Sequence, residues 1–380
     1  MRRRRARARR APLLVVAALL LVAAAPTRVL AQPERARSAR ARWVVTRDAF
    51  ADLWYHGLAV IGADGYGPLS LYAAAYRADV RTVKHRRGSV TRLDDAAAEL
   101  RAELRADSAY EVLHFVPAYF VGEDPVAVLA ALRRALTAGV AARPGSGALD
   151  TRAAAVAGAL PTARERRSLL ALVDLLDDEW RAFVRDDRAG RAPDAISVAR
   201  LQDEWDRTFA PPLAGWLDVV GRGRGGVIVV VPAVGAEGRI VAGAGTRRAV
   251  VVVTADVRSA GPTGPLLAAV RELAFPLLDA LPSASVASAW GDGADRVAAS
   301  RARDVAAVRG GALLLEGTAP ALAARYRRFY LEAAPPGPAA QPSFEQAYPL
   351  DARAERALRS AASRFAAPPT AMPRPAHTER

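Results

Sequence analysis

Apolar residues recur at three- and four-residue steps through most of the first 220 positions. We expect Thr46 to cap the first helix, which continues through apolar positions to Ile61. Further stretches with this spacing lie at residues 69–83, 91–104, 126–138, 162–183, 196–209 and 213–220. The prolines at 211 and 212 are expected to interrupt the last of these helices. The pattern therefore predicts a helical region over residues 43–220.

The pattern changes after Gly221. Two runs rich in β-branched residues, 227–231 and 249–254, predict strands, and residues 239–241 form a candidate strand between them. We expect a small sheet that includes a hairpin. Helical spacing then returns at 266–278, 294–315, 320–331 and 350–365. The predicted fold class is α+β and predominantly α-helical, with a helical N-terminal part followed by a small sheet plus helices.

The N-terminus has the organisation of a signal peptide. Arginines crowd positions 2–10, residues 11–25 are apolar, and small residues precede Gln32. The apolar run is shorter than the roughly 20 residues of a membrane span, although an uncleaved anchor is the alternative. We therefore expect an exported protein, periplasmic or secreted, without a membrane span after cleavage.

The remaining boundaries follow from composition and helical spacing. We predict a signal peptide, a linker, the helical region, a sheet region with helices, a second linker, a C-terminal helix and a disordered tail. The corresponding residues are 1–31, 32–42, 43–220, 221–332, 333–342, 343–365 and 366–380.

The net charge of +15 belongs partly to the predicted signal. Residues 1–31 hold eight arginines and no acid, which leaves +7 for the rest of the chain. Lys84 is the only lysine, and it lies in the densest basic run, residues 81–87. We expect a solvated helix face there, with an anionic ligand site as the alternative. No basic cluster is interleaved with aromatic residues, so we expect no nucleic-acid partner.

Cysteine is absent, which excludes disulfides and thiolate metal sites. The histidines are His56, His85, His114 and His377, and no two are three or four positions apart. No histidine pair can therefore hold a metal on one helix turn. His56 and His114 lie in apolar stretches, and we expect structural roles for both. The chain also has no G-x-S-x-G elbow and no P-loop.

One predicted helix carries a motif-like string. Residues 271–275 read R-E-L-A-F within the 266–278 helix, for which we expect Thr263 as the cap. In an H-E-x-x-H motif two histidines one turn apart hold zinc, beside a glutamate that activates water. Here the glutamate, Glu272, is present, and Arg271 and Phe275 stand at the histidine positions. Farther along, residues 316–319 read E-G-T-A.

The strands, this helix and the E-G-T-A run together resemble the peptidase-MA-like gluzincins, a family of zinc metallopeptidases. The resemblance covers residues 227–331. It implies that Glu272 matches the catalytic glutamate and Glu316 the third zinc ligand. Because phenylalanine does not ligate zinc and Arg271 opposes a dication, it also implies a degenerate site with no cofactor, no metal and no catalytic residue. We expect Arg271 to replace the ion by pairing with Glu316.

These observations favour an exported, catalytically inactive metallopeptidase-like protein with a binding or scaffolding role. Its partner is expected to be a peptide or a protein, added as a strand at the sheet edge. One alternative is an active zinc metallohydrolase that uses His56 or His114 with Glu272 and Glu316. Another is an exported helical protein unrelated to peptidases, in which residues 266–278 form an ordinary buried helix with Arg271 and Glu272 on its solvent side.

Overall fold

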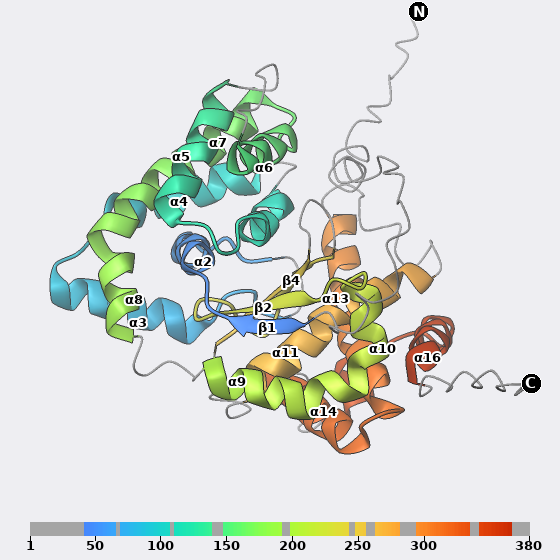
Figure 1. Ribbon diagram of the computed structural model, residues 1–380. Coiled ribbons are helices and arrows are strands. Elements are labelled where there is room, and N and C mark those ends of the chain that lie inside the picture. Colours follow the sequence, from blue (N-terminus) through green and yellow to red (C-terminus); the bar gives the residue numbers. More distant parts are fainter. Residues whose placement is uncertain are drawn as a thin grey trace, which may run out of the picture.

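A four-stranded mixed sheet lies at the centre of the computed structural model of the chain (Figure 1). Its strands are β1 (Trp43–Thr46), β2 (Gly226–Val231), β3 (Arg239–Val241) and β4 (Ala249–Thr254), in the order β1-β2-β4-β3. β1, β2 and β4 are parallel, and β3 runs antiparallel to β4. The chain is therefore α+β and predominantly helical, as the pattern predicts, and β3 and β4 form the expected hairpin.

Helices cover both faces of the sheet (Figure 1). Val229, Val231 and Val252 point into one core, which the N-terminal helices close. Ile228 and Val251 point into a second core, which the C-terminal helices close. Every residue of β4 is buried. This double burial explains why the strands are continuous apolar runs and do not alternate with polar residues.

The first core is built from helices that connect β1 to β2. They are α2 (Ala49–Ile61), α3 (Ala74–Arg87), α4 (Arg92–Arg105), the 3₁₀ segment η2 (Tyr110–Tyr119), α5 (Pro125–Ala138), α6 (Ala148–Gly158), α7 (Ala163–Glu179), the π-helical turn η3 (Trp180–Val184) and α8 (Arg185–Arg191). Capping boxes at Thr91 and Thr162 begin α4 and α7. In each box the threonine and an acid three positions later satisfy helix-end N–H groups reciprocally.

The second core uses the last helices before β2 and the helices that follow the sheet in the chain. They are α9 (Val198–Glu204), the π-helical turn η4 (Trp205–Phe209), α10 (Ala210–Val220), α11 (Gly264–Leu273), the 3₁₀ segment η6 (Phe275–Ala280), α13 (Ala294–Glu316), α14 (Pro320–Ala333), α15 (Phe344–Ala347) and α16 (Ala352–Ala366). Figure 1 shows α9, α10, α11 and α14 on the side of the sheet opposite α2.

The structure corrects the predicted boundary between a helical region and a sheet region. β1 lies inside the predicted helical region, and the last residue of β1 is Thr46, which was expected to cap a helix. Asp48 caps α2 in its place, because its side chain accepts a hydrogen bond from Ala51 N–H. The predicted helix at 69–83 begins only at Ala74, since Tyr72 forms a β-bridge with Val234.

The prolines at 211 and 212 do not interrupt the helix. The chain stays helical from α9 through η4 into α10, and both prolines lie in the first turn of α10. The π-helical turn just before them is wider than an α-turn, and Ala210 N–H bonds to the Trp205 carbonyl. Proline lacks the N–H that an α-helix would use at these positions, and the first turn needs none.

The structure describes residues 42–65, 69–106, 110–138, 147–191, 198–242, 248–255, 263–281, 294–334 and 342–366. The predicted signal peptide, most of both predicted linkers and nearly all of the predicted tail lie outside these residues, as does His377. Within the described ranges, no helix combines the length and the apolar character needed to cross a membrane.

Candidate functional site: a buried arginine–carboxylate cluster

The R-E-L-A-F string lies where α11 packs against β4. All ten residues of α11 are buried, including Arg271 and Glu272. The α-helix ends at Leu273, and the chain continues as the 3₁₀ segment η6. Pro276, inside the predicted 266–278 helix, has no N–H to extend the α-helical ladder. Phe275 therefore lies beyond the α-helix, and positions 271 and 275 are not one turn apart on a regular helix face.

Arg271 is fully buried and ionically paired. Its Nη1 donates to Glu272 Oε1, and its Nη2 donates to Asp304 Oδ1 of α13 at 2.5 Å. The guanidinium carbon lies 5.0 Å from the centre of the Phe275 ring. A buried charge needs such partners because removal from water is costly. Both residues at the motif's histidine positions thus contact each other, and the guanidinium satisfies two carboxylates.

Glu272 faces a backbone group as well as Arg271. Its Oε1 accepts a 3.0 Å hydrogen bond from Gly238 N–H, directly before β3. A side chain at position 238 would not fit, since a Cβ atom would lie 2.4 Å from the Val252 carbonyl oxygen and 2.8 Å from Glu272 Cγ. Glycine here allows the chain to pass between β4 and the carboxylate.

A second ion pair flanks Gly238. Arg239 Nη1 donates to Glu237 Oε1 and also to the Gly238 carbonyl, at 2.8 Å. The Arg239 guanidinium lies 5.7 Å from the centre of the Phe115 ring of η2. We name Glu237, Arg239, Arg271, Glu272 and Asp304 the central cluster. All five side chains are buried, and together they join both cores at the β3 edge of the sheet.

Burial dominates the electrostatics of the central cluster. It raises the pKa of Glu272, and the nearby guanidiniums of Arg271 and Arg239 only partly oppose this. Burial and repulsion from Glu237 together raise the pKa of Asp304 to about 7, against the attraction of Arg271 and Arg239. Burial alone would lower the pKa of Arg271, but the charges of Glu272 and Asp304 raise it well above its usual value.

Glu316 is not part of this cluster, and the predicted Arg271–Glu316 ion pair is wrong. Glu316 is the last residue of α13, and its half-exposed side chain pairs with Arg327 and Arg359. The acid of α13 that reaches Arg271 is Asp304, twelve positions earlier. Twelve residues of α-helix span about 18 Å. The structure thus brings Arg271, Glu272 and Phe275 together and leaves Glu316 at the surface.

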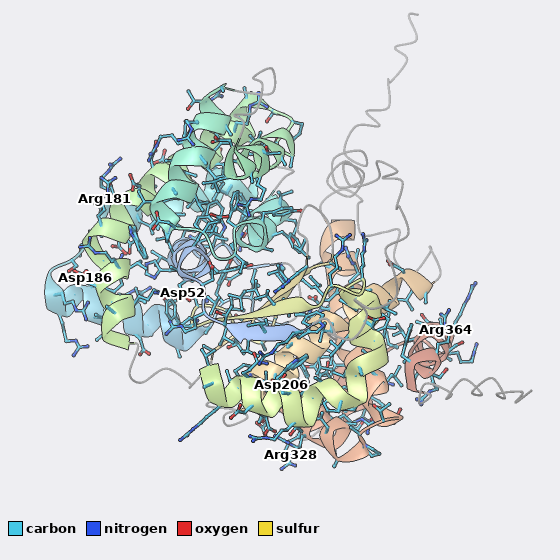
Figure 2. The ribbon with its side chains drawn as sticks, in the orientation of Figure 1. Asp52, Arg181, Asp186, Asp206, Arg328 and Arg364 are labelled. Atoms are coloured by element: carbon cyan, nitrogen blue, oxygen red, sulfur yellow. The ribbon has the colours of Figure 1, made fainter. Side chains whose placement is uncertain are left out.

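The expected solvent-facing position of Arg271 and Glu272 in an ordinary buried helix is also wrong, because both are buried. Most other charged side chains do point outward. Figure 2 shows Arg181, Asp186, Arg328 and Arg364 at the rim of the molecule and Asp206 on the helix that faces the viewer. Asp52, by contrast, lies inside near the start of α2, where Arg47 and Arg188 pair with it.

His56 has the expected structural role. Its Nε2 lies 2.8 Å from Glu179 Oε1, and its Nδ1 lies 2.8 Å from the Tyr76 hydroxyl. A carboxylate only accepts, so Nε2 donates to Glu179. His114 is also buried, and its Nδ1 lies 3.0 Å from the Tyr72 hydroxyl. Burial and the charge of Arg239 lower the pKa of His114 well below its usual value.

Lys84 belongs to the same buried group as His56 and corrects the prediction of a wholly solvated basic run. Its ammonium lies 2.7 Å from Glu179 Oε1, 2.7 Å from Asp94 Oδ2 and 3.2 Å from Thr91 Oγ1. The other basic residues at the end of α3, His85, Arg86 and Arg87, are exposed. We name His56, Lys84, Thr91, Asp94 and Glu179 the lysine cluster.

Comparison with protein-family models, curated protein sequences and solved structures gives no match. The described residues contain no group of three or more histidine, aspartate or glutamate side chains placed to hold a metal ion.

Sequence reasoning missed three members of the central cluster. Asp304 was detectable in principle, because it interrupts an apolar stripe of α13 that continues through Val308 and Leu315. Glu237 and Arg239 surround a glycine in a glycine-rich turn, which looks like an ordinary solvated loop. Only the three-dimensional packing of β3 against α11 shows that these charges are buried.

Proposed function

We propose that the chain is an exported, non-catalytic protein with a binding or scaffolding role, in which a metallopeptidase-like helix has become a structural element. One observation carries this proposal. Arg271, which stands where the resemblance implies a zinc-binding histidine, is buried, and its guanidinium pairs with Glu272 and Asp304. A dication at this position would face a permanent positive charge. The resemblance to gluzincins remains a prediction.

The alternative of an active metallohydrolase finds no support in the histidines. His56 is hydrogen-bonded within the lysine cluster, and His114 bonds to Tyr72. Glu316 is bound by two arginines at the surface. Glu272 is buried and already accepts from Arg271 and Gly238, so it has no solvent access with which to activate a water molecule.

The partner is proposed to be a peptide or a protein, and the sheet edges limit how it could bind. At the β1 edge, Gln202 of α9 accepts from Val45 N–H at 2.7 Å and donates to the Trp43 carbonyl at 3.2 Å. The amide thus takes the place of a neighbouring strand. The opposite edge strand, β3, is only three residues long. Contact through side chains on a helical surface therefore fits better than strand addition.

Metal content tests the proposal. The purified full chain is incubated with excess zinc chloride, desalted and measured by plasma mass spectrometry, and its hydrolysis of casein is assayed in parallel. We expect far less than one zinc per chain and no hydrolysis above that of a Glu272→Gln variant. One tightly held zinc per chain, or hydrolysis abolished by Glu272→Gln, would contradict the proposal.

Export is tested separately at the predicted cleavage site. Expressed in a bacterium with its own N-terminus, the protein should be recovered outside the cytoplasm with Gln32 as its first residue, as measured by intact mass. Recovery of full-length chain from the cytoplasm alone would contradict export without affecting the prediction for zinc.

A further inference from the structure

The central cluster contains more negative than positive charge. Three carboxylates, on Glu237, Glu272 and Asp304, face two guanidiniums, on Arg239 and Arg271. None of the five residues is more than 7% exposed. An uncompensated charge is costly at this depth, so a buried group with such an excess tends to bind a proton or a cation.

The groups around the cluster do not remove the excess. Glu111 of η2 and Arg303 of α13 both lie close enough to interact with it, and their charges cancel. Asp279 of η6 is exposed and interacts with Arg303. The other titratable neighbours stay neutral. Burial raises the pKa values of the phenols and lowers that of the imidazole of His114 well below its usual value. The phenols are those of Tyr55, Tyr72, Tyr326, Tyr330 and Tyr348.

Two buried carboxylate oxygens mark the place of the excess charge. Asp304 uses Oδ1 to accept from Arg271, and Glu237 uses Oε1 to accept from Arg239. Within the described part of the chain, Asp304 Oδ2 and Glu237 Oε2 have no hydrogen-bond partner. Buried polar atoms are rarely left in this state. A proton on one carboxyl would both remove a charge and supply a donor.

We propose that the central cluster is a proton-binding site, in which Asp304 holds one proton and its loss loosens the contact between α11 and α13. The site goes beyond the proposed binding role and is independent of it. Asp304 is the only member on α13, and Arg271 connects it to α11. When Asp304 loses the proton, its negative charge repels that of Glu237, and this repulsion weakens the contact between α13 and α11.

The direction of the pH effect follows from the raised pKa of Asp304. A carboxyl that binds its proton more tightly in the folded state stabilises the fold below its unfolded pKa, and that stability is lost as the pH rises through the folded pKa. For Asp304 the window runs from 3.8 to about 7. One proton corresponds to at most a tenfold change in the unfolding equilibrium constant per pH unit.

The test compares the full-length protein with an Asp304→Asn variant in urea unfolding between pH 5 and 8 at constant ionic strength. We expect the ratio of the wild-type to the variant unfolding constant to rise several-fold per pH unit up to about pH 7. The lowered pKa of His114 has the opposite effect on stability below pH 6.5, and it cancels in this ratio. A surface control, Glu316→Gln, should keep the slope of the wild type. Equal slopes for the wild type and Asp304→Asn would overturn the proposal.

A second variant keeps the proposal testable if Asp304→Asn does not fold. Glu237→Gln removes the charge that most strongly repels Asp304, so the pH transition should move to lower pH. Wild-type hydrogen exchange in α11 and α13 should accelerate by more than the intrinsic tenfold per pH unit up to about pH 7. An unmoved transition in Glu237→Gln contradicts the proposal. So does a transition that shifts when sodium is replaced by tetramethylammonium, since the site would then bind a metal cation.

Discussion

Each buried charge in this protein is stabilised by a few specific neighbouring residues. The lysine cluster shows the requirement clearly, because an ammonium has three donors and here meets three acceptors, on Thr91, Asp94 and Glu179. A guanidinium in its place would spread five donors over a plane. This geometry accounts for a lysine at position 84 in a chain whose other fixed positive charges are arginines.

Replacing Lys84 with methionine should lower the free energy of unfolding by about 3–5 kcal/mol, because Glu179 would be left buried with a charge that Lys84 no longer compensates. Lys84→Arg should also destabilise, since the planar group does not match the three acceptors. Urea unfolding followed by circular dichroism measures both changes.

Arg86→Met provides the matched control for this experiment, because Arg86 is on the same helix and exposed. Its effect should stay within about 0.5 kcal/mol. If Lys84→Met were as mild as Arg86→Met, the ammonium would not be needed to compensate the buried carboxylates.

The sequence predicted the role of a residue only where that role did not depend on a partner distant in the sequence. A structural role for His56 was predictable from its apolar neighbours alone. The partners of Lys84 and Arg271 were not predictable, because they lie 95 positions away, at Glu179, and 33 positions away, at Asp304. Lys84 was expected to face water, and Arg271 was expected to pair with Glu316; both expectations failed.

At the scale of elements, the packing of α13 depends on two adjacent glycines. A Cβ atom at Gly311 would lie 2.3 Å from the Tyr326 hydroxyl oxygen and 2.6 Å from its Cζ atom. That hydroxyl donates a 3.0 Å hydrogen bond to the Val308 carbonyl. At Gly310 a Cβ atom would meet Ala274 Cβ at 3.3 Å, which a small shift relieves. The close approach of α13 and α14 therefore requires glycine at position 311.

Gly311→Ala should destabilise the protein by about 1–3 kcal/mol, because the buried Tyr326 ring must move. The gain in helix propensity, about 1 kcal/mol, is too small to offset this change. Gly310→Ala should be close to neutral, since the same gain balances a mild contact. Thermal unfolding of the two variants side by side measures the difference, and equal midpoints would contradict this account.

Elements were predicted well where the signal was local. The two valine-rich strands and the helical spacing of most helices follow from short stretches of sequence. β1 was missed because it is four residues long and pairs with β2 across about 180 positions. Helix α6 was missed too, since its alanine-rich sequence has little amphipathic contrast.

At the scale of the whole molecule, the central cluster and the lysine cluster contribute to stability with opposite dependences on pH. In the lysine cluster, burial alone would raise the pKa of Glu179. The hydrogen bonds and charge interactions with His56 and Lys84 outweigh burial and lower the pKa to about 2. This contribution is complete above pH 4.5 and is lost as the pH falls toward 2, whereas that of Asp304 is lost toward 7. The two groups together predict greatest stability near pH 4–5.

The acid side of this profile is testable with Glu179→Gln. The variant cannot gain or lose the proton, so its deficit relative to the wild type should shrink as the pH falls from 5 to 2, by on the order of 3 kcal/mol. Urea unfolding at several pH values measures the deficit. A deficit that stays constant over this range would show that Glu179 does not titrate there.

The fold class was predictable because it depends on the density of helical spacing and on two valine-rich runs. The division into a helical region and a sheet region was not, since the sheet takes its first strand from the start of the helical region. The candidate site was located to the correct helix and assigned the wrong partner. Local pattern identifies a helix, but the neighbour of its charged face depends on how distant segments pack.

The burial of the only lysine has a practical consequence. A lysine-specific endoprotease has a single cleavage site in this chain, after residue 84, inside the last turn of α3. In the folded protein that side chain is held by acceptors from α4 and α7. Cleavage therefore requires α3 to detach. The rate at which the two fragments appear would measure how often this one helix opens, without any label. Amine-reactive dyes would likewise mark this position only in molecules that have opened.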